Sequence, residues 1–573
     1  MEKRLTMANL SVVILYPKKT QIHGLQQDAL LLEKCMNVKN VRHADPLEPP
    51  SSCDIAIHLE IPVYGWMPWA SKNICVVNPE WWNTEWNSYL KHMDLLIFKC
   101  KEDADRFPSN VPSIVLPWTT PVPTYTFDSY TRTILHSAGC LFLTGASLHK
   151  KAAAYKLAPL WKESWPPLHI YSKESLDIPI LASNVTVHVK DLGEAERNEL
   201  QAYYPCHIVL SASEALSLVA HEGMAAGAFL IGNELPTYKD CFPTSETSYL
   251  VPATLVERNA GLADTFSTLE VSLEAAINAF LDTDISATRA AQKKKYNDRL
   301  ARFKVDVKQL VSNFTEDKRP DLPPSMKDAD LPFISVVTLL YNRRKFVNLA
   351  LHNLLLTDYP KEKIEWVVVE DSDSTDEQAS DMVIKFGRNA SPMNVTYVPL
   401  ETKTDIGEKR NIGVKRSQHD IILMMDDDDH YPPSSFRRRV SWLLLHPWAP
   451  KAAVCTTIAC YDLIHGTSAV NSPPFTIGLN KRISEATLTF KKSWWEEKGF
   501  PATSVSEGEG FLEGREDEVL ELPPQQCIVA FSHGKNMSSR KIPAGQASCF
   551  WGFPQEFLTF IHGLAGISIE EIT

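Results

Sequence analysis

The stretch DIILMMDDDDHYPP, residues 420–433, decides the fold and indicates where the site lies. Its apolar run, Ile421 to Met425, has the length and composition of a buried strand. Four consecutive aspartates, Asp426 to Asp429, follow at once, and a double proline ends the segment. Adjacent carboxylates repel one another, so crowding them at the end of a core strand costs free energy unless a positive charge lies between them. The pattern therefore predicts a strand whose carboxyl end holds a cation.

Strand-like and helix-like runs alternate around this stretch. Three further apolar runs have strand character, at residues 333–342, 364–371 and 395–401, and helical patterns separate them. The alternation predicts a parallel sheet with crossover helices, and such a sheet binds ligands where the carboxyl ends of its strands meet. Polar residues stand at these ends, including Tyr341 and Asp371. Carboxylate oxygens there suit Mg²⁺ or Mn²⁺ that also binds a substrate diphosphate.

Residues 332 to about 540 resemble a family 2 glycosyltransferase with the GT-A fold. The matching elements are ISVVTLLYNRR, VVVEDSDSTD, IGEKRNIGV, LMMDDDDHYPP, SEGEGFLEGR and SHGKNMS, which keep the family's order and approximate spacing. The resemblance implies a nucleotide-sugar donor, most often UDP-linked, and a glycan or glycoconjugate acceptor. It also implies a metal-dependent transfer that inverts the anomeric carbon.

The resemblance places the donor on four residues. Tyr341 and Asp371 match the residues that hold the nucleotide base, and Arg410 with Asn411 lies in the segment that approaches the diphosphate. Two alternative interpretations stay open: Asp371 as a plain turn residue, and Arg410 as a cation on a helix surface.

The resemblance also implies the metal ligands. Asp426 and Asp428 match the outer residues of the family's DxD element, with Asp428 expected to bind the metal directly. His533 matches a late histidine near the diphosphate or the metal, and a purely structural histidine is the alternative.

The acceptor side is expected in the segment SEGEGFLEGR and just before it. Glu509 aligns with the acidic residue that deprotonates the acceptor hydroxyl, and Glu507 is the alternative, because family members usually carry Glu-Asp where this chain has Glu-Gly-Glu. Trp494 and Trp495 could stack on an acceptor sugar, or they could belong to the core.

The N-terminal half has its own α/β pattern. Short apolar runs alternate with helical patterns from Leu10 to about Phe314, and the Pro- and Thr-rich segment 116–133 divides them into two sets. We expect two Rossmann-like lobes in a GT-B-like module at 1–315, with the lobes at about 1–130 and 131–315. A linker at 316–331 and a GT-A module at 332–573 complete the expected division of the chain.

The segment SASEALSLVAHEGMAAGAFLIGN, residues 211–233, carries Glu214 and Glu222. A helix that begins after Ser213 would place both on one face, about two turns apart. The segment resembles the paired-glutamate element of GT-B glycosyltransferases of the family 4 or family 1 type. The resemblance implies that Glu222 binds the donor ribose and that Glu214 lies near the transferred sugar.

Other features of the N-terminal half bear on this resemblance. Lys150 or Lys151, in a strand-loop-helix segment similar to the family's, is expected to meet the diphosphate. The family usually has glycines just after the first glutamate, whereas this chain has Ala-Leu-Ser at 215–217, and side chains there could hinder the donor.

Composition excludes several classes of protein. The 573 residues are 44% hydrophobic and 22% charged, which is typical of a globular protein. The formal net charge of −12 disfavours sequence-independent binding to nucleic-acid phosphates. No apolar run approaches the roughly 18 residues of a transmembrane helix, and the N-terminus has no signal-peptide pattern. The 11 cysteines lack CxxC pairs, which predicts reduced thiols, a cytoplasmic location and no zinc site.

The sequence thus predicts a two-module glycosyltransferase, with transfer in the C-terminal module and a second transferase activity in the N-terminal one. The alternative is that only the C-terminal module is catalytic and the N-terminal module is a degenerate binding or structural domain. Two rivals rank lower. A scaffold with two decayed modules would not need the run of aspartates, and a nucleotidyltransferase would need a glycine-rich loop where the chain reads LLYNRRKF.

Overall fold

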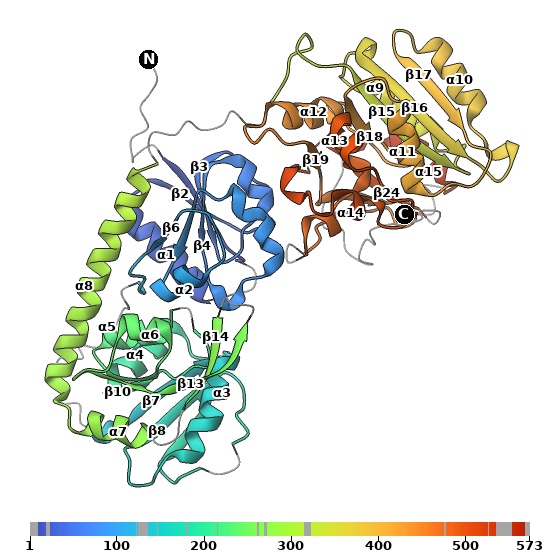
Figure 1. Cartoon of the computed structure of the whole chain (residues 1–573). Coiled ribbons are helices and arrows are strands. Elements are labelled where there is room, and N and C mark those ends of the chain that lie inside the picture. The colour runs from blue at the N-terminus through green and yellow to red at the C-terminus, as the bar shows by residue number, and fades with distance from the viewer. Residues whose placement is uncertain are drawn as a thin grey trace.

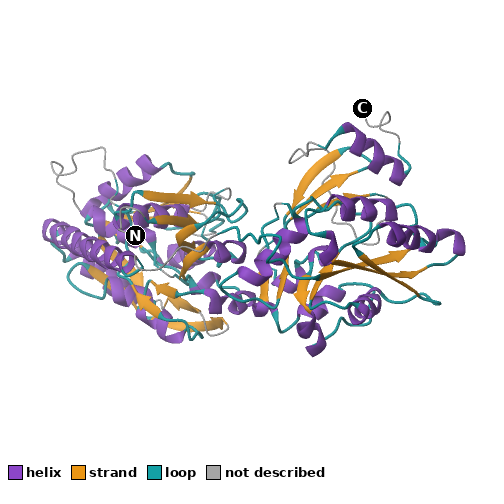
Figure 2. Ribbon diagram, turned by 90° about the horizontal axis from the view of Figure 1, so that it is seen from above, coloured by secondary structure: helices purple, strands orange, loops and turns teal. Residues whose placement is uncertain are grey.

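The computed structural model of the protein describes residues 10–18, 23–121, 123, 136–145, 147–178, 181–214, 216–259, 263–268, 272–314, 322–474, 477–524, 526–533 and 553–567. The N-terminal and C-terminal halves lie side by side, each with its own parallel strands (Figure 1, Figure 2). This confirms the predicted α/β class with parallel sheets. The predicted lobe boundary near residue 130, residues 316–321 of the predicted linker and residues 534–538 of the SHGKNMS element lie outside the described residues.

The first lobe is built on a six-stranded sheet in the order β2-β1-β3-β4-β5-β6, with every named pair parallel. Its strands and helices are β1 (Ser11–Leu15), α1 (His23–Met36), β2 (Asn40–Ala44), β3 (Cys53–Leu59), β4 (Ala70–Val76), β5 (Leu95–Phe98), α2 (Lys101–Arg106) and β6 (Ser113–Val115). Strand β3 is buried along its whole length, as its nearly continuous apolar sequence predicts for the centre of a covered parallel sheet.

The second lobe repeats this architecture with the order β12-β11-β10-β7-β8-β9, again with parallel pairs throughout. Its strands are β7 (Cys140–Gly145), β8 (Leu168–Ser172), β9 (Val185–Val189), β10 (Cys206–Ile208), β11 (Phe229–Asn233) and β12 (Ser248–Val251). Its helices are α3 (Leu148–Leu157), α4 (Glu194–Tyr203), α5 (Leu218–Ala226), α6 (Pro236–Cys241) and α7 (Leu273–Leu281). An antiparallel hairpin, β13 (Ala253–Asn259) and β14 (Ala263–Thr268), is added to it.

Helix α8 (Ile285–Ser312) runs along both lobes (Figure 1). Asp284 caps its N-terminus, because its carboxylate accepts hydrogen bonds from the backbone amides of Ser286 at 2.8 Å and Ala287 at 3.1 Å. The buried side chains of α8, such as Tyr296, belong to one hydrophobic cluster that also contains residues of both lobes. The helix therefore holds the two lobes together.

The C-terminal half is built on a mixed seven-stranded sheet in the order β17-β16-β15-β18-β22-β19-β23. Its strands are β15 (Ile334–Tyr341), β16 (Ile364–Asp371), β17 (Asn394–Pro399), β18 (Ile421–Met424), β19 (Ala452–Val454), β22 (Thr489–Lys491) and β23 (Val519–Glu521). Its helices are α9 (Val347–Leu356), α10 (Ser380–Asn389), α11 (Ile406–Arg416), α12 (Ser435–Leu445), α13 (Lys492–Glu497) and α14 (Glu507–Leu512). Strands β17, β16, β15 and β18 are parallel, so their carboxyl ends meet at one edge.

A smaller sheet, β21-β20-β24, extends this half. Its strands are β20 (Ile458–Asp462), β21 (Thr467–Asn471) and β24 (Val529–Ser532), and helix α15 (Gln555–Ala565) packs on them through Ile561. No helix of the described residues is long and apolar enough to cross a bilayer.

The first lobe and the C-terminal half share a hydrophobic cluster, which the sequence pattern does not predict. Tyr64 lies in it and donates its hydroxyl hydrogen bond to the carbonyl oxygen of Val519, on β23. The ring of His92 stacks on that of Trp448, with 3.9 Å between their centroids. We call this contact the lobe–sheet interface; it makes the first lobe part of the packing of the seven-stranded sheet.

Candidate active site at the carboxyl edge of the seven-stranded sheet

Tyr341 and Asp371 lie opposite each other at the ends of β15 and β16. Asp371 is almost fully buried and both of its oxygens are occupied: Oδ1 accepts from Lys409 Nζ at 2.5 Å, and Oδ2 accepts from the backbone amide of Thr404 at 2.8 Å. Burial lowers the pKa of Lys409, and the Asp371 carboxylate opposes that shift. A buried ion pair of this kind fixes the end of β16, which a plain turn residue would not do.

The Tyr341 side chain is held by polar groups from two other loops. Its hydroxyl donates to Asp373 Oδ2 at 2.8 Å and accepts from Lys403 Nζ at 2.9 Å. The Lys403 ammonium also lies 4.4 Å from the centroid of the Tyr341 ring. The ring is thus fixed at the rim of the strand ends.

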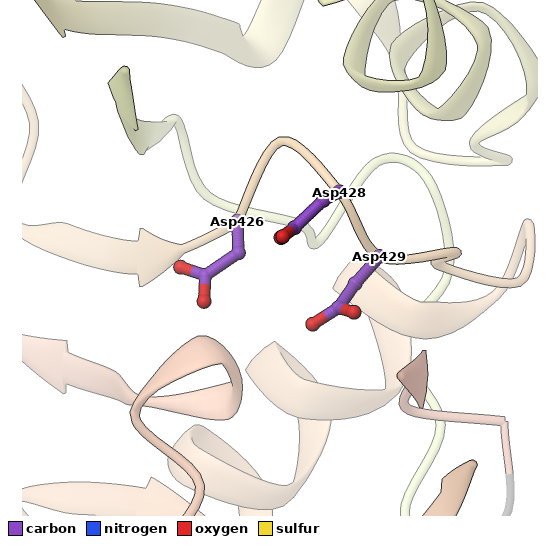
Figure 3. A group of neighbouring side chains, drawn as sticks. All are labelled: Asp426, Asp428 and Asp429. Atoms are coloured by element: carbon purple, nitrogen blue, oxygen red, sulfur yellow. The ribbon is translucent and has the colours of Figure 1, made fainter. Parts of the chain in front are cut away.

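The run of aspartates after β18 forms a cluster. Asp426, Asp428 and Asp429 each offer one carboxylate oxygen within 4.8 Å of the others. Figure 3 shows their side chains directed into the same space beside the loop that carries them. The predicted ligands Asp426 and Asp428 therefore come together, and Asp429, which the motif comparison did not single out, joins them.

Arg343, at the end of β15, supplies positive charge to this cluster. Its Nη1 donates to Asp427 Oδ1 at 3.2 Å and also to Asp428 Oδ2. On the other side, His533 Nε2 lies 3.1 Å from the same Asp428 oxygen. Burial acts to raise the pKa of Asp428. The His533 hydrogen bond and the Arg343 charge lower it by more than burial raises it, so the pKa lies below its ordinary value.

The neighbouring aspartates show the opposite shift. Burial, followed by the charge of Asp428, raises the pKa of Asp427 and of Asp429 well above its ordinary value. The buried Oδ2 of Asp427 has no hydrogen-bond partner among the described residues. One guanidinium does not compensate these carboxylates, and their hard oxygens are the donors that Mg²⁺ and Mn²⁺ prefer. The residues fit a divalent cation.

A second group of charges surrounds Arg410, on α11. Its Nε donates to Glu507 Oε1 at 3.1 Å, its Nη2 lies 3.1 Å from the same oxygen, and both residues are buried. Arg410 is therefore not a surface cation. Burial lowers its pKa, but the charges of Glu507, Asp426 and Glu485 raise it above its ordinary value. Glu485 is an acid of this site that the sequence patterns did not indicate.

The remaining predicted residues on this side have different surroundings. Asn411 Oδ1 accepts from Trp495 Nε1 at 2.9 Å, and its Nδ2 donates to the carbonyl oxygen of Phe500 at 2.9 Å, so this asparagine ties α11 to the segment after α13. Trp494 is fully buried, and the Arg515 guanidinium carbon lies 3.7 Å from its ring centroid. A buried indole has no free face for a sugar, so Trp494 is a core residue. Glu509 lies half-buried on α14.

In the second lobe, the predicted helix from residue 214 is wrong at its start. Helix α5 begins at Leu218, so Glu214 and Glu222 do not share one helix face. Ser217 has φ 60° and caps the helix, and Glu214 Oε1 accepts from the Ser217 amide at 3.1 Å. Such local side-chain bonds to the backbone compete with helix formation.

Each predicted residue of this lobe has a partner within the lobe. Lys150 Nζ lies 3.5 Å from Glu214 Oε2. Glu222 Oε2 accepts from Gln201 Nε2 at 2.7 Å, and its other oxygen lies 3.8 Å from Arg197 Nη2. The structure thus brings Lys150 to Glu214 and places Glu222 in a separate pair, while Lys151 bonds Glu174 at 2.6 Å.

Sequence reasoning missed Arg343, Lys409 and Glu485. Arg343 directly follows the Tyr341-Asn342 strand end, and a cation beside an acidic run is a signal that could have been used. Glu485 lies in the segment RISEAT, far in sequence from both Asp426 and Glu507, and no local pattern there indicates proximity.

Comparison with known proteins finds one family model that matches within this half. The model of Glycosyl transferase family 2 matches residues 335–462, which run from β15 through the aspartate cluster to β20. No curated protein shows significant similarity to the chain.

Solved structures show weaker likeness. The mannosyltransferase PcManGT from Pyrobaculum calidifontis, solved with GDP-Man and Mn²⁺, is 21% identical over 38% of this chain and 60% of its own length, with a TM-score of 0.30. S. aureus TarS with UDP-GlcNAc is 20% identical over 36% of this chain and 61% of its own, with a TM-score of 0.27.

A third structure, the pneumococcal O-GlcNAc transferase GtfA with UDP and GlcNAc, is 16% identical over 46% of this chain and 57% of its own, with a TM-score of 0.34. The chain spans about 60% of the length of the solved structures it matches first. Values this low assign neither a fold nor a function to the chain. The family model and the strand order together show that the C-terminal half contains a family 2 glycosyltransferase domain of the GT-A type.

Proposed function

We propose that the protein is a metal-dependent, inverting glycosyltransferase that moves a sugar from a nucleotide-sugar donor, UDP-linked, to a glycan acceptor. The observation that carries the proposal is the convergence of Asp426, Asp428 and Asp429 at the carboxyl edge of a family 2 domain. Residues 332–573 form the catalytic module of the proposal, and residues 1–315 form a GT-B-like module joined to it by 316–331.

In the proposed donor complex, Tyr341 and Asp371 hold the nucleotide base and α11, with Arg410 and Asn411, approaches the diphosphate. Lys409 supports this role of Asp371, because its buried ammonium fixes the carboxylate at the end of β16.

Asp426 and Asp428 hold Mn²⁺ or Mg²⁺ in the proposal, with His533 orienting Asp428 through their 3.1 Å contact. The bound cation supplies positive charge to the diphosphate as it leaves. The buried Oδ2 of Asp427, which has no hydrogen-bond partner among the described residues, supports a cation at this cluster.

On the acceptor side, a carboxylate takes the proton of the acceptor hydroxyl as its oxygen bonds to the anomeric carbon. The bond from that carbon to the diphosphate breaks, and its electron pair leaves with the diphosphate. One displacement from the opposite face inverts the anomeric carbon. The family motif gives the base role to Glu509, with Glu507 as the alternative, and it gives Trp495 a place beside the acceptor. The ion pair of Glu507 with Arg410 favours Glu509 of these two glutamates.

The N-terminal module has two candidate roles. A second transferase site would use Glu222 for the donor ribose, Glu214 near the transferred sugar, and Lys150 or Lys151 at the diphosphate. A binding or structural module is the alternative, and the lobe–sheet interface supports it, because the first lobe packs into the core of the C-terminal half.

A panel of sugar nucleotides tests the proposal. We expect the full chain to release nucleotide from one of them in the presence of Mn²⁺ or Mg²⁺ and to stop in excess EDTA. Release that continues at the full rate in EDTA would rule out the metal, and no release from any donor would rule out the transferase.

Thermal unfolding of the full chain with a nucleotide distinguishes the two candidate roles of the N-terminal module. Thermal unfolding is followed with UDP or GDP in the Glu222→Ala variant and in the wild type. A stabilisation that Glu222→Ala removes indicates a second donor site, and equal stabilisation in both indicates a binding or structural module.

A further inference from the structure

Glu485 lies directly against the backbone of the segment that carries Glu507 and Glu509. It opens a short turn, Glu485–Thr487, just before β22. A methyl group added to Gly508 would lie 2.6 Å from Glu485 Cγ and 2.8 Å from Glu485 Oε1. A side chain at this position would have to displace the side chains of Glu485 and Ile483, so Gly508 lets Glu485 pack against the SEGEG segment.

The turn that carries Glu485 is fixed by Arg482. This buried arginine donates to both oxygens of Glu521 on β23, at 3.3 and 3.2 Å, and to the hydroxyl of Tyr89 in the first lobe at 3.2 Å. Its Nε donates to the carbonyl oxygen of Ile477 at 2.9 Å. Glu485 is thus held on a rigid support, which a group that positions a substrate atom requires.

The carboxylates of Glu485 and Glu507 differ in their hydrogen-bond and ion-pair partners. Glu507 Oε1 accepts a hydrogen bond from Arg410 Nε and lies 3.1 Å from Arg410 Nη2, so the guanidinium occupies this oxygen. Among the described residues, no side chain donates a hydrogen bond to the carboxylate of Glu485. Its lone pairs are therefore available to a hydroxyl group of a substrate.

The charges that face Glu485 come from three elements: Glu507 on α14, Arg410 on α11 and Asp426 after β18. Burial and then the charge of Glu507 raise the pKa of Glu485, and Arg410 opposes the shift. A carboxylate with a raised pKa is a stronger base than one with an ordinary pKa.

We propose that Glu485 is a further catalytic residue, which binds the acceptor hydroxyl and takes its proton while the hydroxyl oxygen bonds to the anomeric carbon. The bond to the diphosphate breaks in the same step, and the electron pair leaves with the diphosphate. This inference rests on the proposed function, and it assigns to Glu485 the role that the family motif gives to Glu509 or Glu507.

The test compares Glu485→Gln, Glu507→Gln and Glu509→Gln in the full chain, with the sugar nucleotide that the donor panel selects. We expect Glu485→Gln to lower kcat by roughly 10²-fold or more, with the donor KM little changed, and to remove the acidic limb of the pH profile. The two other variants should lose less, and Glu485→Asp should recover part of the rate. Glu513→Gln, an exposed acid of the same segment, is the matched control.

A second variant separates this role from a loss of folding. Gly508→Ala keeps every acid but pushes the side chains of Glu485 and Ile483 away, so kcat should fall while Mn²⁺ binding stays near that of the wild type. Wild-type kcat in Glu485→Gln, with activity lost in Asp428→Asn, would overturn the role of Glu485 and leave the proposed function intact. A wild type that turns over no sugar nucleotide would overturn both.

Discussion

The acids after β18 and the glutamates of the second lobe both follow parallel strands, but their charges are compensated differently. In the second lobe, Glu214 has Lys150, and Glu222 has Gln201 with Arg197. After β18, Asp427 and Asp428 share the guanidinium of Arg343, and the charge of Arg410 acts on both Asp426 and Glu507. An acid with a partner of its own is satisfied by the protein, whereas acids that share one cation leave negative charge for a ligand to neutralise.

The largest effect should follow from a change in the crowded cluster. Asp428→Asn should abolish metal-dependent transfer, a loss of roughly 10³-fold or more, because the cation's charge on the leaving diphosphate is worth several kcal/mol. Nucleotide release and Mn²⁺ binding are the measurements. Asp420→Asn, which changes an exposed acid before the same strand, is the control. Wild-type rates in Asp428→Asn would show that the acids after β18 need a cation no more than the glutamates of the second lobe do.

Arg343→Gln tests whether this arginine compensates the aspartates. Without a divalent cation, we expect it to lower the free energy of unfolding by about 3 kcal/mol, because buried carboxylates then lose their positive partner. Mn²⁺ should restore more stability to this variant than to the wild type. Denaturant unfolding with and without Mn²⁺ measures both. An equal gain in the two proteins would show that Arg343 and the metal do not act on the same charges.

Glu222→Ala makes the converse test in the second lobe. It should lower the free energy of unfolding by about 1–3 kcal/mol without any ligand, since the buried amide of Gln201 loses its acceptor. Added Mn²⁺ should leave this loss unchanged. Glu246→Ala, at an exposed position of the same lobe, should have little effect. A Glu222→Ala variant as stable as the wild type would mean that this acid is not satisfied by its neighbours.

The smallest effect concerns the lobe–sheet interface, which joins the first lobe to the half that carries the aspartate cluster. Burial, then the charge of Lys91, lowers the pKa of His92 from 6.5 to about 3. The unfolded chain therefore takes up a proton as the pH falls below 6.5 while the folded protein does not, and stability falls, by about 2 kcal/mol at pH 5. His92→Phe keeps the ring on Trp448 and should lose this part of the pH dependence. Parallel unfolding curves at pH 7 and pH 5 measure it, and identical pH dependence in both proteins would contradict the burial of a neutral imidazole.

The α/β class and the polar strand ends were predictable because they depend on local patterns. Strand β18 with its aspartates, and the parallel order of its neighbours, follow from apolar runs that alternate with helical ones. The start of α5 was not predictable from spacing alone, because Ser217 and Glu214 bond to the backbone and stop the helix at Leu218.

The contacts across the site were the least predictable part. Arg343 reaches Asp428 from another strand, and Glu485 reaches Gly508 from another turn, so neither contact has a sequence period. The lobe–sheet interface was missed for a related reason: Tyr64 and Trp448 lie in segments that read as ordinary core in their own halves, and only the fold brings their rings together.

The lobe–sheet interface means that the two halves are held together by packing as well as by the peptide chain that connects them. The C-terminal half expressed by itself would expose the part of the cluster around Val519 and Ile483 to water, and we expect it to aggregate. If residues 1–321 and 322–573 are produced as two polypeptides in the same cell, we expect them to associate and to purify as one complex. The smallest part of this protein that we expect to stay folded is therefore set by the lobe–sheet interface. Cutting the chain between residues 321 and 322 would break the covalent connection but leave the two halves packed together.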